Sequence, residues 1–144
     1  MTVEIAVSHV GICTSDLNRS IRFYTEALHF KFEYCVDVGQ PFDVLTELAG
    51  IKCRAGFLRQ DGLRIEIVGY DTPEVTGTAQ RRPMNQLGMT HLSLVVDDID
   101  KVATRIAAFG GQVHAETKVA TPKGQLLFCT DPDGVRLELW QKAK

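Results

Sequence analysis

The first half of the chain contains one alternating stretch, one helical stretch and then three more alternating stretches. Residues 7–12 alternate between apolar and polar side chains, which predicts a strand. Apolar residues then recur every three or four positions over residues 17–28, so we expect a helix capped by Ser15 or Asp16. Further strands are predicted at residues 32–38, 55–59 and 63–68, the last two joined by a Gln-Asp-Gly turn.

The second half shows the same order of patterns. A strand is predicted at residues 91–96 and a helix at residues 99–109. Asp97 or Asp98 is expected to cap this helix, and a glycine pair ends it. The remaining strands are predicted at residues 112–118, 126–130 and 135–141.

Two stretches lack a clear period. Residues 71–88 are polar and contain proline and glycine, which indicates a linker. Residues 40–52 are expected to form a loop with one helical turn. Because long connections in compact domains are often functional lids, this loop is expected to border a cleft, and a plain surface insertion is the alternative. The apolar side chains of this loop are Phe42, Val44, Leu45 and Leu48.

The order of patterns reflects an internal repeat. The segment from His9 to Leu17 aligns with the segment from His91 to Ile99 at an offset of 82 residues. Asp61-Gly-Leu-Arg-Ile-Glu66-Ile aligns with Asp133-Gly-Val-Arg-Leu-Glu138-Leu at an offset of 72 residues. The sequence therefore predicts one domain over residues 1–144 made of two modules, at about residues 5–70 and 89–142, with a linker at residues 71–88.

Four polar residues of the repeat point away from the apolar faces of their strands. Because residues two apart share a face, His9 and His91 lie opposite the apolar residues of the first strand of each module. Glu66 and Glu138 occupy the same position in the last strand of each module. Two imidazoles and two carboxylates related by the repeat indicate a site for one divalent metal ion, with nickel, cobalt, zinc, iron or manganese as suitable metals.

Composition narrows the class of protein. The chain has 16 Lys and Arg against 18 Asp and Glu, a net charge of −2 and a pI near 6.1, so a nucleic-acid partner is not expected. No apolar run approaches the roughly 20 residues of a membrane span, and the start of the chain lacks the pattern of a signal peptide. The four scattered cysteines are expected to be free thiols, and the expected compartment is the cytoplasm.

The repeat resembles the vicinal-oxygen-chelate superfamily, which includes glyoxalase I, extradiol dioxygenases and bleomycin-resistance proteins. The likeness rests on His9-Val-Gly-Ile with the following helix, on His91-Leu-Ser-Leu, and on Asp131-Pro-Asp-Gly-Val-Arg-Leu-Glu138-Leu. It implies an α+β fold of two tandem βαβββ modules that form a cupped, incomplete β-barrel around a metal site. It also implies that His9, Glu66, His91 and Glu138 are the ligands and that the protein is a homodimer.

The shared chemistry of the superfamily favours a metal-dependent lyase or isomerase that acts on a small carbonyl-bearing substrate. Glu138 is the first choice for the base that removes a proton next to the carbonyl, and Glu66 is the second. An Fe(II) dioxygenase using His9, His91 and Glu138 is one alternative, and a non-catalytic drug-binding resistance protein is another.

Two arginines accompany the glutamates. Arg64 and Arg136 each lie two residues before a glutamate on the same strand face. They are interpreted either as solvated residues at the rim of the site or as a grip for an anionic substrate.

Overall fold

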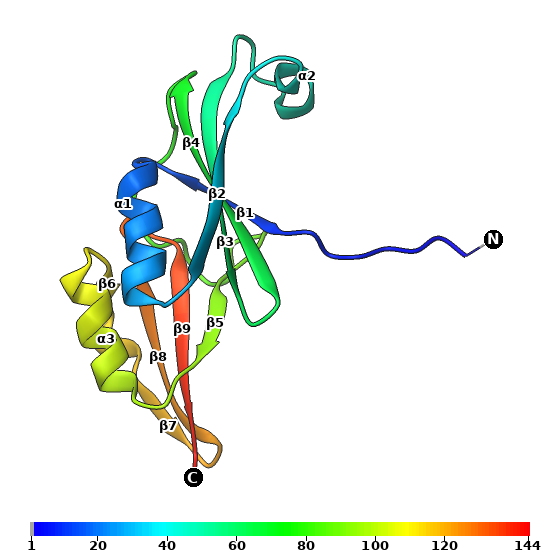
Figure 1. The fold of residues 1–144 in the computed structure, drawn as a ribbon. Coiled ribbons are helices and arrows are strands. Elements are labelled where there is room, and N and C mark those ends of the chain that lie inside the picture. Colours follow the sequence, from blue (N-terminus) through cyan, green and yellow to red (C-terminus); the bar gives the residue numbers. More distant parts are fainter. Residues whose placement is uncertain (1) are drawn as a thin grey trace. The chain divides into compact units, whose positions relative to one another are not determined.

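The computed structural model describes residues 2–144 and consists of two compact units, each built on its own β-sheet (Figure 1). The first unit contains the chain up to Ile21 and residues His29–Val75, and the second contains Arg22–Leu28 and Thr76–Lys144.

The first unit has a four-stranded sheet in the order β1-β4-β3-β2. Its elements are β1 (Val10–Thr14), α1 (Leu17–Arg22), β2 (Lys31–Val38), α2 (Phe42–Thr46), β3 (Lys52–Gln60) and β4 (Leu63–Thr72). Strand β1 pairs in parallel with β4, whereas the other pairs are antiparallel. Asp61 and Gly62 join β3 to β4 with φ angles of 45° and 80°, the positive values that a tight hairpin turn of this length requires.

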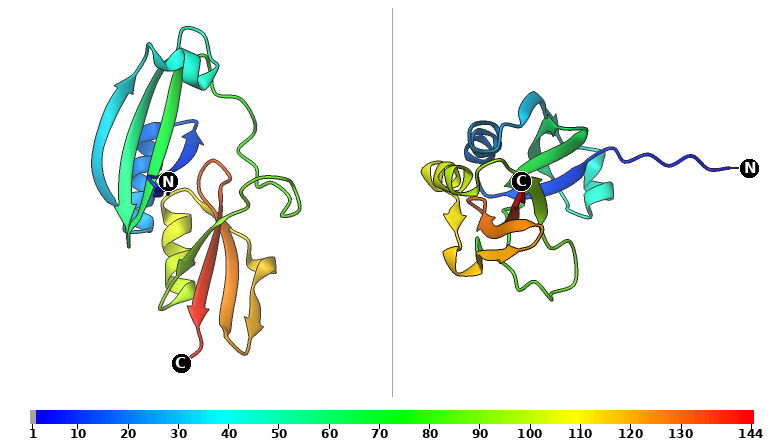
Figure 2. Two further views of the ribbon diagram at one scale, coloured as in Figure 1. Left: turned by 90° about the vertical axis from the view of Figure 1, so that its right-hand side faces the viewer. Right: turned by 90° about the horizontal axis from the view of Figure 1, so that it is seen from below.

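Helix α1 covers one face of this sheet. Asp16 caps the helix, since its Oδ1 accepts a hydrogen bond from the backbone N–H of Arg19 at 3.0 Å. A Cβ atom at Gly56 would lie 2.9 Å from the side chain of Ile21, so glycine permits the close approach of helix and sheet. Helix α2 lies on the opposite side of the sheet (Figures 1 and 2).

The second unit has a sheet in the order β5-β9-β8-β6, with β7 also paired to β8. Its elements are the π-helix η1 (Phe23–Ala27), β5 (Leu92–Val95), α3 (Ile99–Ala108), β6 (Gln112–Val113), the 3₁₀ turn η2 (Ala115–Thr117), β7 (Val119–Thr121), β8 (Gly124–Thr130) and β9 (Arg136–Lys142). Strand β5 pairs in parallel with β9, as β1 pairs with β4 in the first unit.

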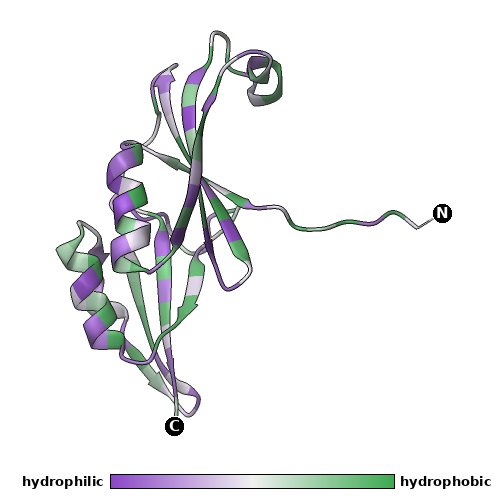
Figure 3. Ribbon diagram, viewed as in Figure 1, coloured by the Kyte–Doolittle hydropathy of each residue, from purple (hydrophilic) through white to green (hydrophobic). Residues whose placement is uncertain are grey.

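The core of the second unit lies between the helices and the sheet. Ile99 and Ile106 of α3 are buried, while the polar residues of the helix alternate with these apolar ones in the sequence (Figure 3). Asp98 caps α3 by accepting a hydrogen bond from the N–H of Lys101. A Cβ atom at Gly111 would lie 2.5 Å from the carbonyl oxygen of Thr130, so only glycine fits where the chain leaves α3.

A buried polar network holds the turn that leads into β9. Asp131 is 2% exposed, and its Oδ1 accepts hydrogen bonds from the N–H groups of Asp133 and Val135 at 2.9 Å each. The hydroxyl of Tyr24 donates to Oδ2 at 3.0 Å. Loss of hydration raises the pKa of both Tyr24 and Asp131, as expected for groups removed from water.

The predicted fold class is confirmed: the protein is a mixed α+β chain with two βαβββ-type sheets, and the described residues form no closed barrel. Several strand boundaries were wrong. Strands β3, β4 and β8 extend beyond the predicted residues, and β4 includes the first two residues of the predicted linker. Two other strands are shorter than predicted. The first strand starts at Val10 rather than at residue 7, because β4 begins at Leu63 and the pairing register leaves residue 7 beyond its end. Residues 112–118 form a strand only at Gln112–Val113, since the N–H of Phe128 then bonds to the Thr117 hydroxyl instead of a strand carbonyl.

None of the described helices combines the length and the apolar character needed to cross a membrane.

Candidate functional site

The first unit brings His9 and Glu66 together. His9 immediately precedes β1, and Glu66 lies on β4 at the position that pairs with Gly11. His9 Nε2 lies 3.1 Å from Glu66 Oε2, and both side chains are partly exposed. A Cβ atom at Gly11 would lie 3.8 Å from that oxygen, so both residues belong to the face opposite α1.

The second unit repeats this pair with His91 and Glu138. Ser93 on β5 pairs with Glu138 on β9, in the same register as Gly11 and Glu66. His91 Nε2 lies 3.8 Å from Glu138 Oε1, and the hydroxyl of Ser93 donates to the same oxygen at 2.7 Å. The structure therefore brings together each predicted histidine and the predicted glutamate of its own module.

A hydroxyl holds the other ring nitrogen of each histidine. Ser8 Oγ lies 2.9 Å from His9 Nδ1, and Thr90 Oγ1 lies 2.9 Å from His91 Nδ1. In the tautomer in which Nδ1–H donates to the hydroxyl, Nε2 carries the lone pair that a metal ion binds. Sequence reasoning missed both hydroxyls, although Ser8 and Thr90 match at the repeat offset of 82 residues.

A phenylalanine meets the edge of each histidine ring. Phe57 on β3 and Phe128 on β8 lie with ring centroids 5.5 Å from those of His9 and His91, both in edge contact. Each phenylalanine pairs directly with the glutamate of its unit in the strand register. These residues were also missed, because the hairpins after β3 and β8 differ in length and the two phenylalanines do not align at either offset.

The two arginines have different partners. Arg64 Nε donates to Glu33 Oε2 at 2.7 Å, and this hydrogen bond raises the pKa of Arg64. Arg136 Nε and Nη2 donate to the carbonyl oxygen of Arg82 at 3.0 and 2.8 Å. The pKa of Arg136 is lowered, mainly because burial removes water from the guanidinium and secondly because the positive charge of Arg81 is nearby.

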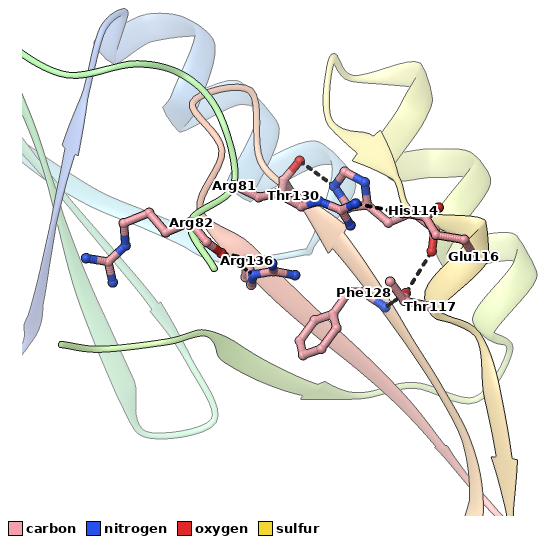
Figure 4. A network of polar contacts seen from close by, with 8 residues as sticks. All are labelled: Arg81, Arg82, His114, Glu116, Thr117, Phe128, Thr130 and Arg136. Carbon is pink, nitrogen blue, oxygen red and sulfur yellow. Dashed lines mark hydrogen bonds and ion pairs between the residues drawn. The ribbon is translucent and has the colours of Figure 1, made fainter. Parts of the chain in front are cut away.

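The other two histidines do not belong to the pairs. His29 has a φ angle of 63°, in the left-handed region, where it follows the helical segment. His114 Nε2 lies 3.3 Å from Thr130 Oγ1 (Figure 4). The pKa of His114 is lowered, mainly by burial and secondly by the positive charge of Arg81. The four cysteines form no disulfide within residues 2–144, as predicted, and burial raises the pKa of Cys129 to about 11.

The donor chemistry of each pair suits a divalent transition metal, since imidazole nitrogen and carboxylate oxygen are ligands that such ions accept. Within residues 2–144, no group of three or more His, Cys, Asp or Glu side chains is gathered closely enough to hold an ion. Each unit thus brings one imidazole nitrogen and one carboxylate together, which is half of the donor set that a four-ligand centre needs.

Comparison with known proteins identifies the family. The model of the Glyoxalase/Bleomycin resistance protein/Dioxygenase superfamily matches residues 6–139. The chain belongs to this superfamily.

Its relatives include a probable chloroplastic lactoylglutathione lyase of Arabidopsis thaliana, 29% identical over 139 residues, which cover 93% of this chain but 35% of that protein. The uncharacterised protein YwbC of Bacillus subtilis is 27% identical over 137 residues, covering 94% and 97% of the two chains. The crystal structure of a glyoxalase family protein from Bacillus cereus aligns with a TM-score of 0.86 at 20% identity, over 99% and 97% of the two chains. That likeness shows the fold.

Proposed function

We propose that His9, Glu66, His91 and Glu138 bind one divalent metal ion, and that the protein is a metal-dependent lyase or isomerase. The substrate is a small molecule that bears a carbonyl group. The observation that carries the proposal is the repetition of one arrangement in both units: a hydroxyl on His Nδ1, His Nε2 turned toward a glutamate, and a phenylalanine at the ring edge. Membership of the superfamily supports it.

The environment of the histidines supports metal binding over a purely structural role. A solvated histidine has no need of a fixed tautomer, whereas a metal ligand is commonly oriented by a hydrogen bond to its second nitrogen. Ser8 and Thr90 supply that bond in both units at the same distance of 2.9 Å. When bound, nickel, cobalt, zinc, manganese or iron(II) would act as a Lewis acid toward the carbonyl oxygen of the substrate.

Glu138 is the proposed base that removes the proton next to this carbonyl. Its Oε1 is fixed by the Ser93 hydroxyl at 2.7 Å, whereas Oε2 has no donor among the described residues. One fixed oxygen orients the carboxylate and the other is left to accept a proton, which is the arrangement that a general base needs. Glu66 lies closer to its histidine, at 3.1 Å, and would remain a metal ligand, whereas Glu138 would leave the metal when substrate binds.

Elemental analysis of the purified protein tests metal binding. Light scattering measures the molar mass of the protein in solution and so tests the proposed homodimer. The wild type is expected to retain one metal ion for each set of His9, Glu66, His91 and Glu138. The His91→Ala variant should lose this stoichiometric binding. His114→Ala is the matched control, because His114 bonds to Thr130 and lies outside the pairs. Equal metal content in the wild type and His91→Ala would contradict the ligand assignment.

The test of the reaction is anaerobic exchange of substrate hydrogen for solvent deuterium, with nickel bound and hemithioacetals of α-keto aldehydes as probes. Glu138→Gln should slow exchange by about 10²–10⁴, the range for loss of a general base, while Glu74→Gln in the linker should not change it. Metal occupancy is measured in the same samples. Turnover that requires both iron(II) and oxygen, without anaerobic exchange, would instead favour a dioxygenase that uses His9, His91 and Glu138.

A further inference from the structure

The two units repeat the same residues around the histidines but differ in charge. In the first unit, Glu33 accepts hydrogen bonds from Arg59 at 2.9 Å and from Arg64 at 2.7 Å. These bonds lower the pKa of Glu33. The negative charge of Glu33 offsets part of the positive charge of Arg64, whose guanidinium lies over the Phe57 ring. Arg64 is therefore committed to a carboxylate of its own unit.

Arg136, the corresponding residue of the second unit, has no carboxylate partner among residues 2–144. Two of its five N–H donors bond to the carbonyl oxygen of Arg82 (Figure 4). The three other donors, on Nη1 and Nη2, have no acceptor in the described part of the chain. Nη1 and Nη2 form the fork of the guanidinium that can bind two oxygens of one anion.

Further positive charge lies near Arg136. Arg81 precedes the residue whose carbonyl Arg136 binds, and Arg81 Nη2 pairs with the exposed Glu116 at 2.7 Å (Figure 4). Arg82 donates its own Nη2 to the carbonyl oxygen of Met89 rather than to an acid. This part of the second unit therefore carries three arginines against one exposed glutamate partner.

The position of Arg136 relates it to the candidate site. Its guanidinium lies 5.1 Å from the centroid of the Phe128 ring, and the same ring meets His91 at 5.5 Å. Arg136 also lies two residues before Glu138 on the same face of β9, which is a separation of roughly 6–7 Å along a strand. An anion held by Arg136 would thus lie a few bonds from a carbonyl that reacts beside Glu138.

We propose that the free fork of Arg136 is a subsite for an anionic group of the substrate, a carboxylate or a phosphonate or phosphate, spaced about three to five bonds from the reacting carbonyl. This inference rests on the proposed function, since it extends the same site. Arg136 differs from Arg64 in its charge balance: Glu33 pairs with Arg64, whereas no carboxylate of residues 2–144 pairs with Arg136.

The probes are levulinate, which carries a carboxylate and a ketone, its neutral amide, and the corresponding keto-phosphonate. Binding is measured by calorimetry or amide chemical shifts on the chain with and without nickel. Levulinate should bind the wild type about ten to a hundred times more tightly than the amide, the worth of charge-assisted hydrogen bonds. The phosphonate arm shows which anion the fork prefers.

Arg136→Gln should remove the preference for levulinate and leave amide binding unchanged, and Arg64→Gln is the matched control that should keep the preference. Arg136→Lys keeps the charge without the fork and should give an intermediate preference. Equal losses for levulinate and the amide in Arg136→Gln would show a purely structural role and overturn the inference. So would an unchanged preference in that variant.

The two proposals fail in different ways. If Arg136→Gln keeps the preference for levulinate while His91→Ala loses metal, the subsite is wrong and the metal centre stands. If the wild type takes up no metal but still shows a preference that depends on Arg136, the subsite stands and the metal-dependent function is wrong. If Arg136→Gln fails to fold, the wild type can still test the subsite. Its preference for levulinate over the amide should fall as added salt screens the charge of Arg136. A preference that does not change with salt would overturn the subsite.

Discussion

Removal of the Tyr24 hydroxyl tests how the turn before β9 is held. Tyr24 is fully buried, and its hydroxyl donates to Asp131 Oδ2 at 3.0 Å. Tyr24→Phe keeps the ring and its packing but leaves a buried carboxylate oxygen without this donor. The change therefore isolates one hydrogen bond to an ionisable acceptor.

The expected loss follows from that geometry. A hydrogen bond to a charged group contributes about 1.5–3 kcal/mol, and Asp131 Oδ1 keeps its two backbone donors in the variant. We expect the free energy of unfolding to fall by about 2 kcal/mol, which corresponds to a Tm lower by roughly 4–8 °C for a chain of this size.

Urea denaturation followed by circular dichroism measures the loss. Tyr34→Phe is the matched control, because Tyr34 is 43% exposed and its hydroxyl has no bond within the described residues. The control should change the free energy of unfolding by less than about 0.5 kcal/mol. A loss equally small in Tyr24→Phe would refute the assignment of the network as a support of the turn.

Two further changes test the backbone and the ionisation of this fold. Burial raises the pKa of Asp131 above its unfolded value, so the stability that it contributes is present below the unfolded pKa and is lost as pH rises through the folded pKa. The wild type should therefore lose stability relative to Asp131→Asn as pH rises from about 4 in a series of urea titrations, and a difference that is constant with pH would contradict this. His29 has a φ angle of 63°, so His29→Gly should be more stable than His29→Ala by about 1 kcal/mol in thermal unfolding, and equal stabilities would show that the backbone there is unstrained.

The sequence predicted the parts of this fold that depend on local periodicity and on the repeat. Alternation located most strands and placed Glu66 and Glu138 opposite the apolar residues, because a strand has a fixed period of two. The repeat then predicted equal registers, and Gly11 pairs with Glu66 as Ser93 pairs with Glu138. The turn at Asp61-Gly62 was predicted correctly, because few residue types adopt the positive φ angles that so short a turn requires.

Contacts between residues far apart in the sequence were not predictable in the same way. The bond from Arg64 to Glu33 crosses 31 positions, and no repeat relates Glu33 to a residue of the second module. The buried pair of Tyr24 and Asp131 crosses 107 positions, and neither residue has a periodicity that reveals the other. The first pair depends on the order of strands β4, β3 and β2 in the sheet, and the second depends on how the helical segment that carries Tyr24 packs near the turn before β9. Local propensity encodes neither arrangement.

The two copies differ in the hydrogen-bond partners of equivalent residues. Gly11 offers no hydroxyl to Glu66, whereas Ser93 fixes Glu138, so only the second glutamate has one oriented and one free oxygen. The same strand, β9, carries Arg136 with its unoccupied donors two residues earlier. Under the proposed function, a substrate whose anion binds Arg136 would lie along β9 with its carbonyl beside Glu138 rather than Glu66. The anion subsite at Arg136 and the base Glu138 are thus two parts of one proposal about the second unit. A Glu138→Gln variant that stays active and keeps the normal preference for levulinate would refute the base and leave the subsite standing.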